Sequence, residues 1–480
     1  MKKTVVLYPG LAVSHFVPMV QLADVLLEEG YAVVVAFIDP IVKGDIALAA
    51  VVDRVAASKP SVAFHKLPRI RDSPAFVHDA NFVVRYFDLV GRYHQHLHDF
   101  LLSMPPGTVH SLILDMMSIE VLDVTSKLKI PAYTFFPSNA SALATSIQVS
   151  SIREQGQLSF RELGDVPLNL YGVPPMPASH LNAELLEDPE REAYKATTKM
   201  MRRIQESQGI LVNTFGSLDA RAVGALGDPH LFPKMPPIYC VGPLVAGSGE
   251  AKENHECLAW LDQQPDHSVV FLCFGGTGAG NHSEEQLKEM ATGLEMSGHR
   301  FLWVVRAPPH HDEPEKPFDP IADPDLDALL PTGFLERTSG RGLVVKLWVP
   351  QVEVLRHRAT GAFVTHCGWN SVLEGITASV PMLCWPLYAE QKMNKVFIVE
   401  EYGIGVEVVG WRQGMMVKAE ELEAKVKMVM EGKEGKLLRA RVCQHKEAAA
   451  MAWKDGSSSR AAFGQFLSEA GCLKQRLTGP

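Results

Sequence analysis

Two residues in the first quarter of the chain have the chemistry of a general base and its orienting partner. His15 follows the β-branched run Lys3–Tyr8 and lies near the start of the next helix-like stretch. The positive end of a helix dipole disfavours imidazolium and keeps the ring neutral, as a general base requires. Asp115 follows a later strand-like run, Leu112–Leu114. If the two strands are neighbours, Asp115 would accept a hydrogen bond from His15 and fix its tautomer.

Each of these residues also has a structural interpretation when it is taken singly. A histidine at this position could be a core or capping residue, and an aspartate after a strand could be a turn or helix cap. The chain has no GxSxG elbow that would supply a nucleophile. A base without a protein nucleophile suggests that the acceptor substrate itself attacks.

A second group of polar residues follows the strand-like run Gly361–Thr365. The segment His366–Ser371 places glycine, backbone amides, Asn370 and Ser371 at the start of a helix. Such a helix terminus can bind a diphosphate without a metal ion. His366 would add a charged or neutral donor to a phosphate oxygen.

Residues on both sides of this segment could bind the rest of a nucleotide sugar. Trp348 offers a flat face for a base, and Glu374, in the helix after His366–Ser371, could bind ribose hydroxyls. Glu390 and Gln391 follow the strand-like run Met382–Trp385 and add polar groups suited to sugar hydroxyls. The second half of the chain therefore has groups for every part of such a ligand.

Alternating strands and helices must position these residues. In the first half, the patterns predict strands at Lys3–Tyr8, Tyr31–Phe37, Ser111–Leu114 and Ala132–Phe136, and helices at Pro18–Glu29 and Ile119–Leu128. In the second half, they predict strands at Val269–Phe274, Phe301–Val305, Leu343–Leu347, Gly361–Thr365 and Met382–Trp385, and a helix at Ser283–Ser297 capped by Ser283. A Gly-rich linker, Val241–His255, separates the halves, and Ala307–Asp327 is predicted to be a surface loop. This order indicates two doubly wound α/β domains with parallel sheets.

Composition excludes several classes of protein. A chain of 480 residues is too long for one ordinary core, and its formal charge of −9 disfavours a nucleic-acid or anionic-membrane partner. No apolar run reaches the length of a membrane-spanning helix, and Pro9 and Gly10 interrupt the N-terminal run, which resembles a buried strand more than a signal peptide. The 7 cysteines are scattered without a CxxC pair. They suit reduced thiols in a cytoplasmic protein.

The span Trp348–Gln391 resembles the PSPG box of the plant secondary-product UDP-glycosyltransferases. It matches that box at nearly every signature position and at the family's length. Shorter segments extend the resemblance over the whole chain: PGLAVSHFVP near the start, GILVNTF at Gly209–Phe215, CVGPL at Cys240–Leu244, WLDQQP at Trp260–Pro265, RFLWVVR at Arg300–Arg306 and LPTGFLERT at Leu330–Thr338.

The resemblance implies a GT-B fold, in which two Rossmann-like doubly wound domains face a central cleft. It implies an acceptor-binding domain over residues 1–245 and a UDP-sugar-binding domain over residues 246–458. A C-terminal helix within residues 459–480 would pack back on the first domain.

The resemblance also implies roles for individual residues. His15 matches the family's catalytic base, and Asp115 matches its charge-relay partner. The matched donor residues are Trp348 and Val349 at uracil, Gln351 and Glu374 at ribose, His366, Asn370 and Ser371 at the diphosphate, Gly368 and Trp369 shaping that loop, and Glu390 and Gln391 at the hexose. Tyr388, two residues before Glu390, is also expected in the donor site. A terminal glutamine such as Gln391 is the family's usual sign of glucose.

One departure from the family pattern concerns the phosphate site. The family usually reads SFGS after the strand Val269–Phe274, whereas this chain reads CFGG and lacks a hydroxyl at Gly276. Thr277 or the backbone amides of this Gly-rich loop would have to replace it, so both Gly276 and Thr277 are expected in the donor site.

The residues and the resemblance together predict an inverting, UDP-glucose-dependent glucosyltransferase. Its acceptor would be a small hydrophobic molecule, such as a phenolic or flavonoid. UDP-glucose is expected as a substrate, with no tightly bound cofactor, no metal and no nucleic-acid partner, in a monomeric cytoplasmic protein. Two alternatives stay open: C-glucosylation of a hydroxylated aromatic acceptor, and a UDP-sugar-binding protein without catalysis.

Overall fold

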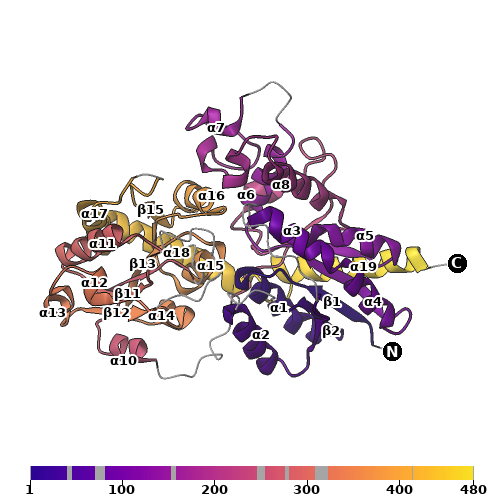
Figure 1. Cartoon of the computed structure of the whole chain (residues 1–480), viewed down its shortest axis with the longest axis horizontal. Helices are drawn as coiled ribbons and strands as arrows, with labels where there is room; N and C mark the ends of the chain where they lie inside the picture. The colour runs from indigo at the N-terminus through magenta and orange to yellow at the C-terminus, as the bar shows by residue number, and fades with distance from the viewer. Residues whose placement is uncertain are drawn as a thin grey trace. The chain divides into compact units, whose positions relative to one another are not determined.

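The computed structural model describes residues 2–39, 46–70, 82–152, 158–245, 255–275, 281–308, 323–412 and 415–478. The chain forms two compact units (Figure 1). The first contains Met1–Ala246 and Met451–Pro480, and the second contains Gly247–Ala450.

The first unit is built on a seven-stranded parallel sheet. Its strands are β1 (Thr4–Tyr8), β2 (Ala32–Ile38), β3 (Ala63–Leu67), β4 (Val109–Asp115), β5 (Ala132–Phe136), β8 (Ile210–Val212) and β9 (Ile238–Cys240). Their order is β3-β2-β1-β4-β5-β8-β9, and every pairing is parallel. A separate antiparallel pair joins β6 (Pro167–Leu168) and β7 (Met176–Pro177). β1 and β4 are buried at every position because helices cover both faces of the sheet.

The helices of the first unit follow the strands in alternation. They are α1 (Val13–Glu28), α2 (Ile46–Ser58), α3 (Phe82–Arg92), α4 (His94–Ser103), α5 (Leu122–Lys127), α6 (Ala140–Val149), α7 (Phe160–Leu163), α8 (Glu192–Arg203), α9 (Ala220–Leu226) and α19 (Ser458–Thr478), with short 3₁₀ turns η1 (Met116–Val121), η2 (Ala178–His180), η3 (Ala183–Leu186) and η4 (Ile204–Glu206). One face of the sheet packs on α1, α2 and α19, in a single core that contains Leu7, Phe16 and Phe466.

The last helix belongs to the first unit although it ends the chain. The hydroxyl of Ser459 donates to the carbonyl oxygen of Gly242 at 2.6 Å, and the hydroxyl of Tyr239 donates to the Glu469 carboxylate at 2.5 Å. Phe466 packs edge to face against Tyr133 of β5, with ring centroids 4.7 Å apart. These contacts hold α19 on the first sheet, along which it runs in Figure 1.

The second unit repeats the design with six parallel strands. They are β10 (Val269–Cys273), β11 (Arg300–Val305), β12 (Gly342–Lys346), β13 (Thr360–Thr365), β14 (Met382–Cys384) and β15 (Gly405–Glu407), in the order β12-β11-β10-β13-β14-β15. The helices are α10 (Glu256–Asp262), α11 (Glu284–Ser297), α12 (Leu326–Leu329), α13 (Phe334–Thr338), α14 (Gln351–Arg356), α15 (Trp369–Ala378), α16 (Gln391–Val396), a π-helical turn η6 (Phe397–Glu401), α17 (Ala419–Glu431) and α18 (Lys433–Met451). Helices α11 and α17 cover one face, and α10 and α14 cover the other.

The predicted boundaries hold well except at the first two helices. Helix α1 begins at Val13 rather than at Pro18, which lies inside it and is buried. Proline favours the first turn of a helix, and its lack of an N–H made it resemble a start signal. The helix predicted at Ile119–Leu128 is instead the 3₁₀ turn η1 followed by the short α5. The earlier start of α1 places His15 in its first turn.

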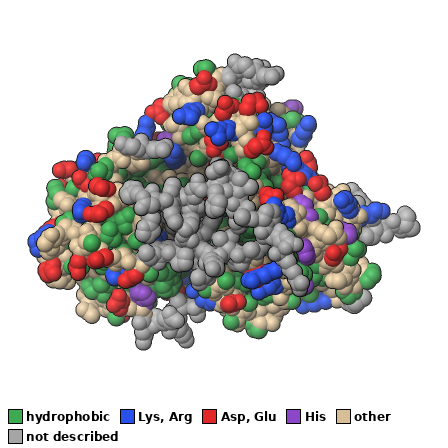
Figure 2. Space-filling model, viewed as in Figure 1, with side chains coloured by type: hydrophobic (Ala, Val, Ile, Leu, Met, Phe, Trp, Pro, Cys, Tyr) green, Lys and Arg blue, Asp and Glu red, His purple; other side chains and the backbone are tan. Residues whose placement is uncertain are grey.

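Among the described residues in Figure 2, acidic and basic side chains are interspersed. Among the described residues, no helix is long and apolar enough to cross a membrane.

Candidate functional site

The first unit brings His15 and Asp115 together at the point where its strand order reverses. β1 pairs with both β2 and β4, so the carboxyl ends of β1 and β4 are adjacent there. His15 follows β1 in the first turn of α1, and Asp115 is the last residue of β4. Ligands of open parallel sheets bind at such reversal points.

The two side chains form a direct hydrogen bond. Nδ1 of His15 lies 2.8 Å from Oδ2 of Asp115, whose side chain is fully buried, while the imidazole is 24% exposed. Oδ1 of Asp115 accepts from the amide of Met117 at 2.9 Å. The carboxylate is thus held on both oxygens, and the ring that it orients still reaches solvent.

Sequence reasoning missed Tyr86 of α3, which supports the loop between β1 and α1. Its buried hydroxyl accepts a hydrogen bond from the amide of Leu11 at 3.0 Å. A Cβ atom at Gly10 would lie 2.7 Å from Oδ1 of Asp115 and 3.1 Å from this hydroxyl. The backbone before His15 therefore fits closely against Asp115 and Tyr86, and glycine is needed at position 10. A tyrosine in an amphipathic helix gives no sequence signal of this contact.

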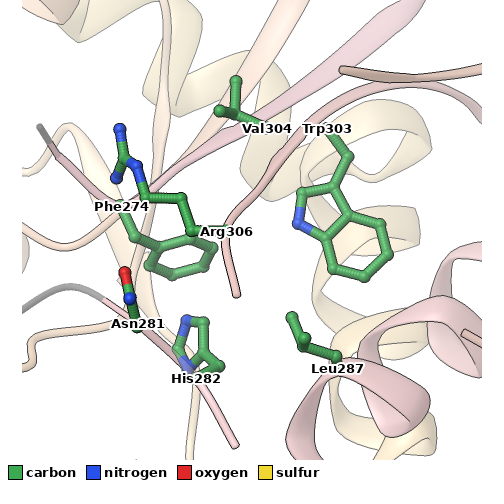
Figure 3. A pocket seen from close by; sticks show the side chains of 7 residues that line it. All are labelled: Phe274, Asn281, His282, Leu287, Trp303, Val304 and Arg306. Carbon is green, nitrogen blue, oxygen red and sulfur yellow. The ribbon is translucent and has the colours of Figure 1, made fainter. Parts of the chain in front are cut away.

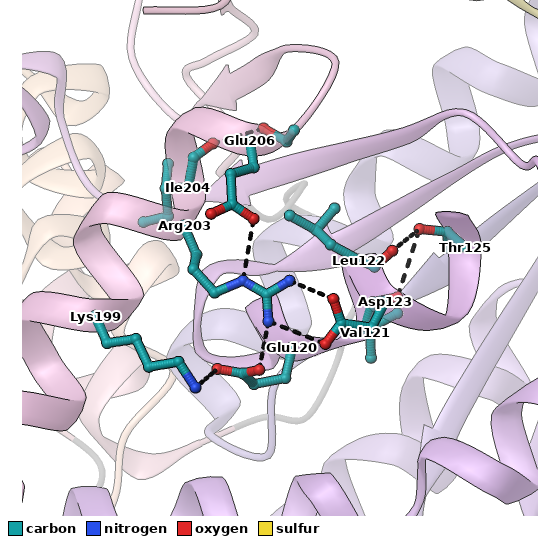
Figure 4. Close-up of polar contacts among 10 residues, drawn as sticks. Glu120, Val121, Leu122, Asp123, Thr125, Lys199, Arg203, Ile204 and Glu206 are labelled. Atoms are coloured by element: carbon teal, nitrogen blue, oxygen red, sulfur yellow. Dashed lines mark hydrogen bonds and ion pairs between the residues drawn. The ribbon is translucent and has the colours of Figure 1, made fainter. Parts of the chain in front are cut away.

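An ion-pair network fastens the segment that follows Asp115 (Figure 4). Arg203 at the end of α8 contacts Glu120, pairs with Asp123 at 2.6 Å and reaches Glu206 at 3.2 Å. Lys199 pairs with the other carboxylate oxygen of Glu120 at 3.0 Å. The Arg203 hydrogen bonds lower the pKa of the Asp123 carboxyl.

In the second unit, the reversal point lies between β10 and β13. β10 pairs with β11 on one side and β13 on the other, and His366 directly follows β13. A Cβ atom at Gly275 would lie 2.9 Å from Nε2 of His366, and a methyl group at Gly368 would overlap the same nitrogen. The imidazole is thus enclosed by two glycine backbones at the N-terminus of α15.

Burial decides the charge of His366. Loss of solvent lowers the pKa of His366 to about 3, and the positive charge of Arg306 acts in the same direction. The ring is therefore neutral at physiological pH. Of the two possibilities raised by the sequence, a charged or a neutral donor, this environment favours the neutral one.

Gln351, Ser371 and Glu374 form one hydrogen-bonded cluster. Nε2 of Gln351 donates to Oε2 of Glu374 at 2.6 Å and to the Ser371 hydroxyl at 2.9 Å. The cluster joins the start of α14 to the first turns of α15. Burial raises the pKa of Glu374 to about 7, although the bond from Gln351 opposes the shift.

Trp348 is presented to solvent by a strained turn. Its amide donates to the carbonyl of Lys346 at 2.7 Å, which closes a tight turn around Leu347 at φ 64°. Trp348 is 46% exposed, whereas the next residue, Val349, is buried. An exposed tryptophan face beside a fixed backbone suits the stacking of a planar ring.

The last part of the predicted donor site is the loop before α16. Oε1 of Gln391 accepts from the amides of Leu387 and Tyr388 at 3.0 and 2.9 Å. Asn394 donates to the carbonyl of Cys367 at 2.9 Å and lies 3.4 Å from Oε1 of Glu390. The α16 loop is therefore tied to the loop that contains His366, with Glu390 at the helix start.

The loops of the second unit share an unusual backbone feature. Leu347, Cys367 and Ala389, at φ 64°, 65° and 51°, lie directly before Trp348, Gly368 and Glu390. Non-glycine residues in this region are strained, and such strain clusters at functional sites.

The predicted residues thus divide between the units. His15 and Asp115 are together in the first, and Trp348, Val349, Gln351, His366, Gly368, Trp369, Asn370, Ser371, Glu374, Tyr388, Glu390 and Gln391 belong to the second. Gly276 and Thr277 lie outside the described residues. Within the described ranges, no group of three or more His, Cys, Asp or Glu side chains could hold a metal ion.

Two cavities within the second unit do not coincide with the predicted donor residues. One, of about 10 Å³, has room for a water molecule and lies among Phe274, Asn281, His282 and Arg306 (Figure 3). The other, of about 350 Å³, lies at the opposite, amino end of β13 beside Arg356, Thr360 and Arg439. Neither contains a residue predicted to bind donor.

Comparisons with known proteins agree with these features. A family profile described as UDP-glucoronosyl and UDP-glucosyl transferase matches residues 228–445. The chain is 39% identical to an anthocyanidin 5,3-O-glucosyltransferase from a Rosa hybrid cultivar, over 96% of this chain and 98% of the relative. It is 36% identical to a phloretin 2'-O-glucosyltransferase of Malus domestica, over 98% of this chain and 99% of the relative.

A solved structure extends the match to three dimensions. Phytolacca americana UGT2, complexed with UDP-2-fluoro-glucose and pterostilbene, has a TM-score of 0.84 and 32% identity, covering 98% of this chain and 99% of that one. The two parallel Rossmann-like sheets and this match show a GT-B fold. The chain belongs to the plant UDP-glycosyltransferase family and is a UDP-glycosyltransferase.

Proposed function

We propose that the protein transfers glucose from UDP-glucose to the hydroxyl of a small phenolic acceptor, with inversion at the anomeric carbon. The observation that carries this proposal is the 2.8 Å hydrogen bond between His15 and buried Asp115 at the reversal point of the first sheet. A protein that only bound UDP-sugars would have no use for this pair. The names of the relatives, which specify anthocyanidin and phloretin O-glucosylation, support the phenolic acceptor.

The chemistry is a direct displacement. Because Nδ1 of His15 is bonded to Asp115, Nε2 is the nitrogen that takes the acceptor's proton. The freed oxygen forms a bond to the anomeric carbon while the bond from that carbon to the UDP phosphate oxygen breaks. The electron pair leaves with UDP. Asp115 stabilises the imidazolium that results.

The second unit would bind and stabilise UDP. Its diphosphate would lie at the N-terminus of α15, where backbone amides and the neutral His366 donate hydrogen bonds. Uracil would stack on Trp348, and the Gln351–Glu374 pair would meet the ribose. We assign acceptor binding to residues 1–245, donor binding to residues 246–458, and a supporting role to residues 459–480.

Glucose specificity is assigned to Glu390 and Gln391. The oxygen of the Gln391 amide is engaged by two backbone amides, so its orientation is fixed and its NH₂ group is the end that would donate to a sugar hydroxyl. A fixed donor distinguishes hydroxyl configurations more sharply than a freely rotating one.

A turnover screen tests this function. Purified protein is incubated with UDP-glucose, UDP-galactose or UDP-glucuronate and a panel of phenols, with and without EDTA, and products are identified by mass spectrometry. We expect glucosides that acid hydrolysis cleaves, made fastest from UDP-glucose and undiminished by EDTA. Preference for another donor, or acid-stable C-glycosides as the main products, would contradict the proposal.

A further inference from the structure

Arg306 is a buried cation at the carboxyl end of β11. The residue is 8% exposed, and its Nε donates to the carbonyl oxygen of Leu347 at 3.1 Å. Across the described ranges, no Asp or Glu forms an ion pair or hydrogen bond with its guanidinium. By comparison, the buried Lys395 of the same unit pairs with Glu407 at 2.9 Å.

A buried charge without a counterion is costly. Burial lowers the pKa of Arg306, but a guanidinium remains protonated in proteins. Desolvating such a group is expensive unless an opposite charge compensates it. Since the described residues supply Arg306 with no carboxylate, an anionic ligand is the natural source of that charge.

The position of Arg306 identifies that ligand. β11 is the neighbour of β10, whose end leads to Gly275 beside the imidazole of His366. The arginine lowers the pKa of His366, and it lines the same small cavity as Phe274 (Figure 3). Its bonded carbonyl, that of Leu347, belongs to the turn before Trp348. Arg306 thus contacts the turn that leads to the loop expected to bind uracil, and it lies close to the loop expected to bind diphosphate.

We propose that Arg306 is the fixed positive charge of the diphosphate site, a donor-binding residue that favours UDP over uncharged nucleosides. The inference rests on the proposed function, because it takes the anion at the α15 terminus to be the donor diphosphate. Since His366 is neutral, Arg306 supplies charge where that loop supplies only dipoles. It also favours departure of UDP, on which negative charge accumulates as the bond to glucose breaks.

The test compares ligands of different charge. Dissociation constants of uridine, UMP and UDP are measured by calorimetry for wild type, Arg306→Met and Arg306→Lys at two salt concentrations. At an effective dielectric constant of about 20, the loss of one unit charge near the diphosphate weakens binding by roughly tenfold to hundredfold. We expect that loss for UDP with Arg306→Met, a smaller loss for UMP, and less than about threefold for uridine. Arg306→Lys should keep most UDP affinity. In Arg306→Met, UDP affinity should depend less on salt concentration than in wild type.

A matched control is Arg341→Met. Arg341 precedes β12 and donates to carbonyl oxygens of Leu294, His299 and Glu295 at the other end of the strands. It should leave the ratio of UDP to uridine affinity unchanged. Thermal unfolding of each variant shows whether it is folded. If Arg306→Met does not fold, Arg306→Lys and Arg306→Gln are compared instead.

Equal losses of uridine and UDP affinity in Arg306→Met would overturn the proposal, because they would mean that Arg306 only supports the Leu347 turn. A lysine variant as weak as the methionine variant would also overturn it. If wild type itself did not bind UDP more tightly than uridine, the diphosphate site of the proposed function would fail instead.

Discussion

Oε2 of Glu374 accepts a hydrogen bond from the side-chain Nε2 of Gln351 at 2.6 Å. Burial raises the pKa of the Glu374 carboxyl to about 7. His366, eight residues earlier at the same helix terminus, is kept neutral by the same physical cause. For a carboxyl group, loss of solvent favours the protonated form, and for an imidazole it favours the deprotonated form. Both groups are neutral in slightly acidic solution, and only Glu374 gains charge as the pH rises through neutrality.

Uridine affinity should therefore rise with pH. Between about pH 6 and pH 8, Glu374 changes from a carboxylic acid to a carboxylate, which accepts hydrogen bonds from ribose hydroxyls. Uridine is the suitable ligand because, unlike UDP, it does not titrate in this range. Calorimetry should show tighter binding at pH 8 in wild type and a flat profile in Glu374→Gln. An equally steep profile in the variant would contradict this role.

At the scale of elements, two glycine-containing loops shape the pocket of one imidazole. Gly275 is the second residue after β10, and Gly368 is the N-cap of α15. Gly275 needs glycine for its φ of 90° as well as for space, whereas Gly368 has an ordinary φ of −63° and needs glycine only for the contact with His366. The second glycine therefore gives a test of packing free of backbone strain.

Gly368→Ala should weaken UDP binding by about tenfold or more, because the added methyl group displaces the His366 ring. In a His366→Ala background, Gly368→Ala should weaken UDP binding by less than about threefold, because the imidazole that the methyl group would overlap is absent. A double-mutant cycle of UDP affinities measures this coupling. Gly464→Ala in α19, where an added methyl meets nothing within 4 Å, is the control. Additive effects would show that Gly368 acts independently of His366.

Most of the helices and strands could be predicted from the sequence, because at these elements the local sequence rules agree with tertiary packing. Ser283 caps α11 as expected, its hydroxyl accepting from the amide of Gln286 at 3.2 Å. The strands and the His366 loop also follow from hydrophobic runs and the box motif. The predicted start of α1 at Pro18 is wrong, because proline usually marks the first turn of a helix, whereas here it lies inside the helix. Tyr86 and Arg306 could not be found, since their roles depend on contacts with Leu11 and Leu347 that only folding creates.

At the scale of the whole molecule, the chain returns to the unit where it began. α19 contributes Phe463 and Phe466 to the core of the first sheet, although the whole second unit separates this helix from β9 in sequence. Stability of the first unit should therefore depend on the last residues of the chain, and donor binding in the second should not.

Phe466→Ala should lower the free energy of unfolding of the first unit by about 3–5 kcal/mol, the usual cost of removing a buried phenylalanine. Leu102→Ala, at a 60% exposed position of the same unit, should cost far less. Thermal and denaturant unfolding, followed alongside UDP calorimetry, check both parts. A parallel loss of UDP affinity in folded Phe466→Ala would show that the units are not independent in this respect.

The central claim is that His15 is the general base, and one set of variants tests it most directly. Turnover and UDP affinity are measured for wild type, His15→Ala and Asp115→Asn with a weakly acidic phenol and with a phenol already ionised at assay pH. General-base catalysis is worth about 10² to 10⁴ in rate, so His15→Ala should lose at least that with the weakly acidic phenol.

The loss should be much smaller with the ionised phenol, and Asp115→Asn should be milder than His15→Ala, because it disturbs orientation without removing the base. UDP affinity should stay within about twofold, since the predicted donor residues belong to the other unit. Near-normal turnover of the weakly acidic phenol by His15→Ala, or a loss of UDP affinity in its place, would contradict the account.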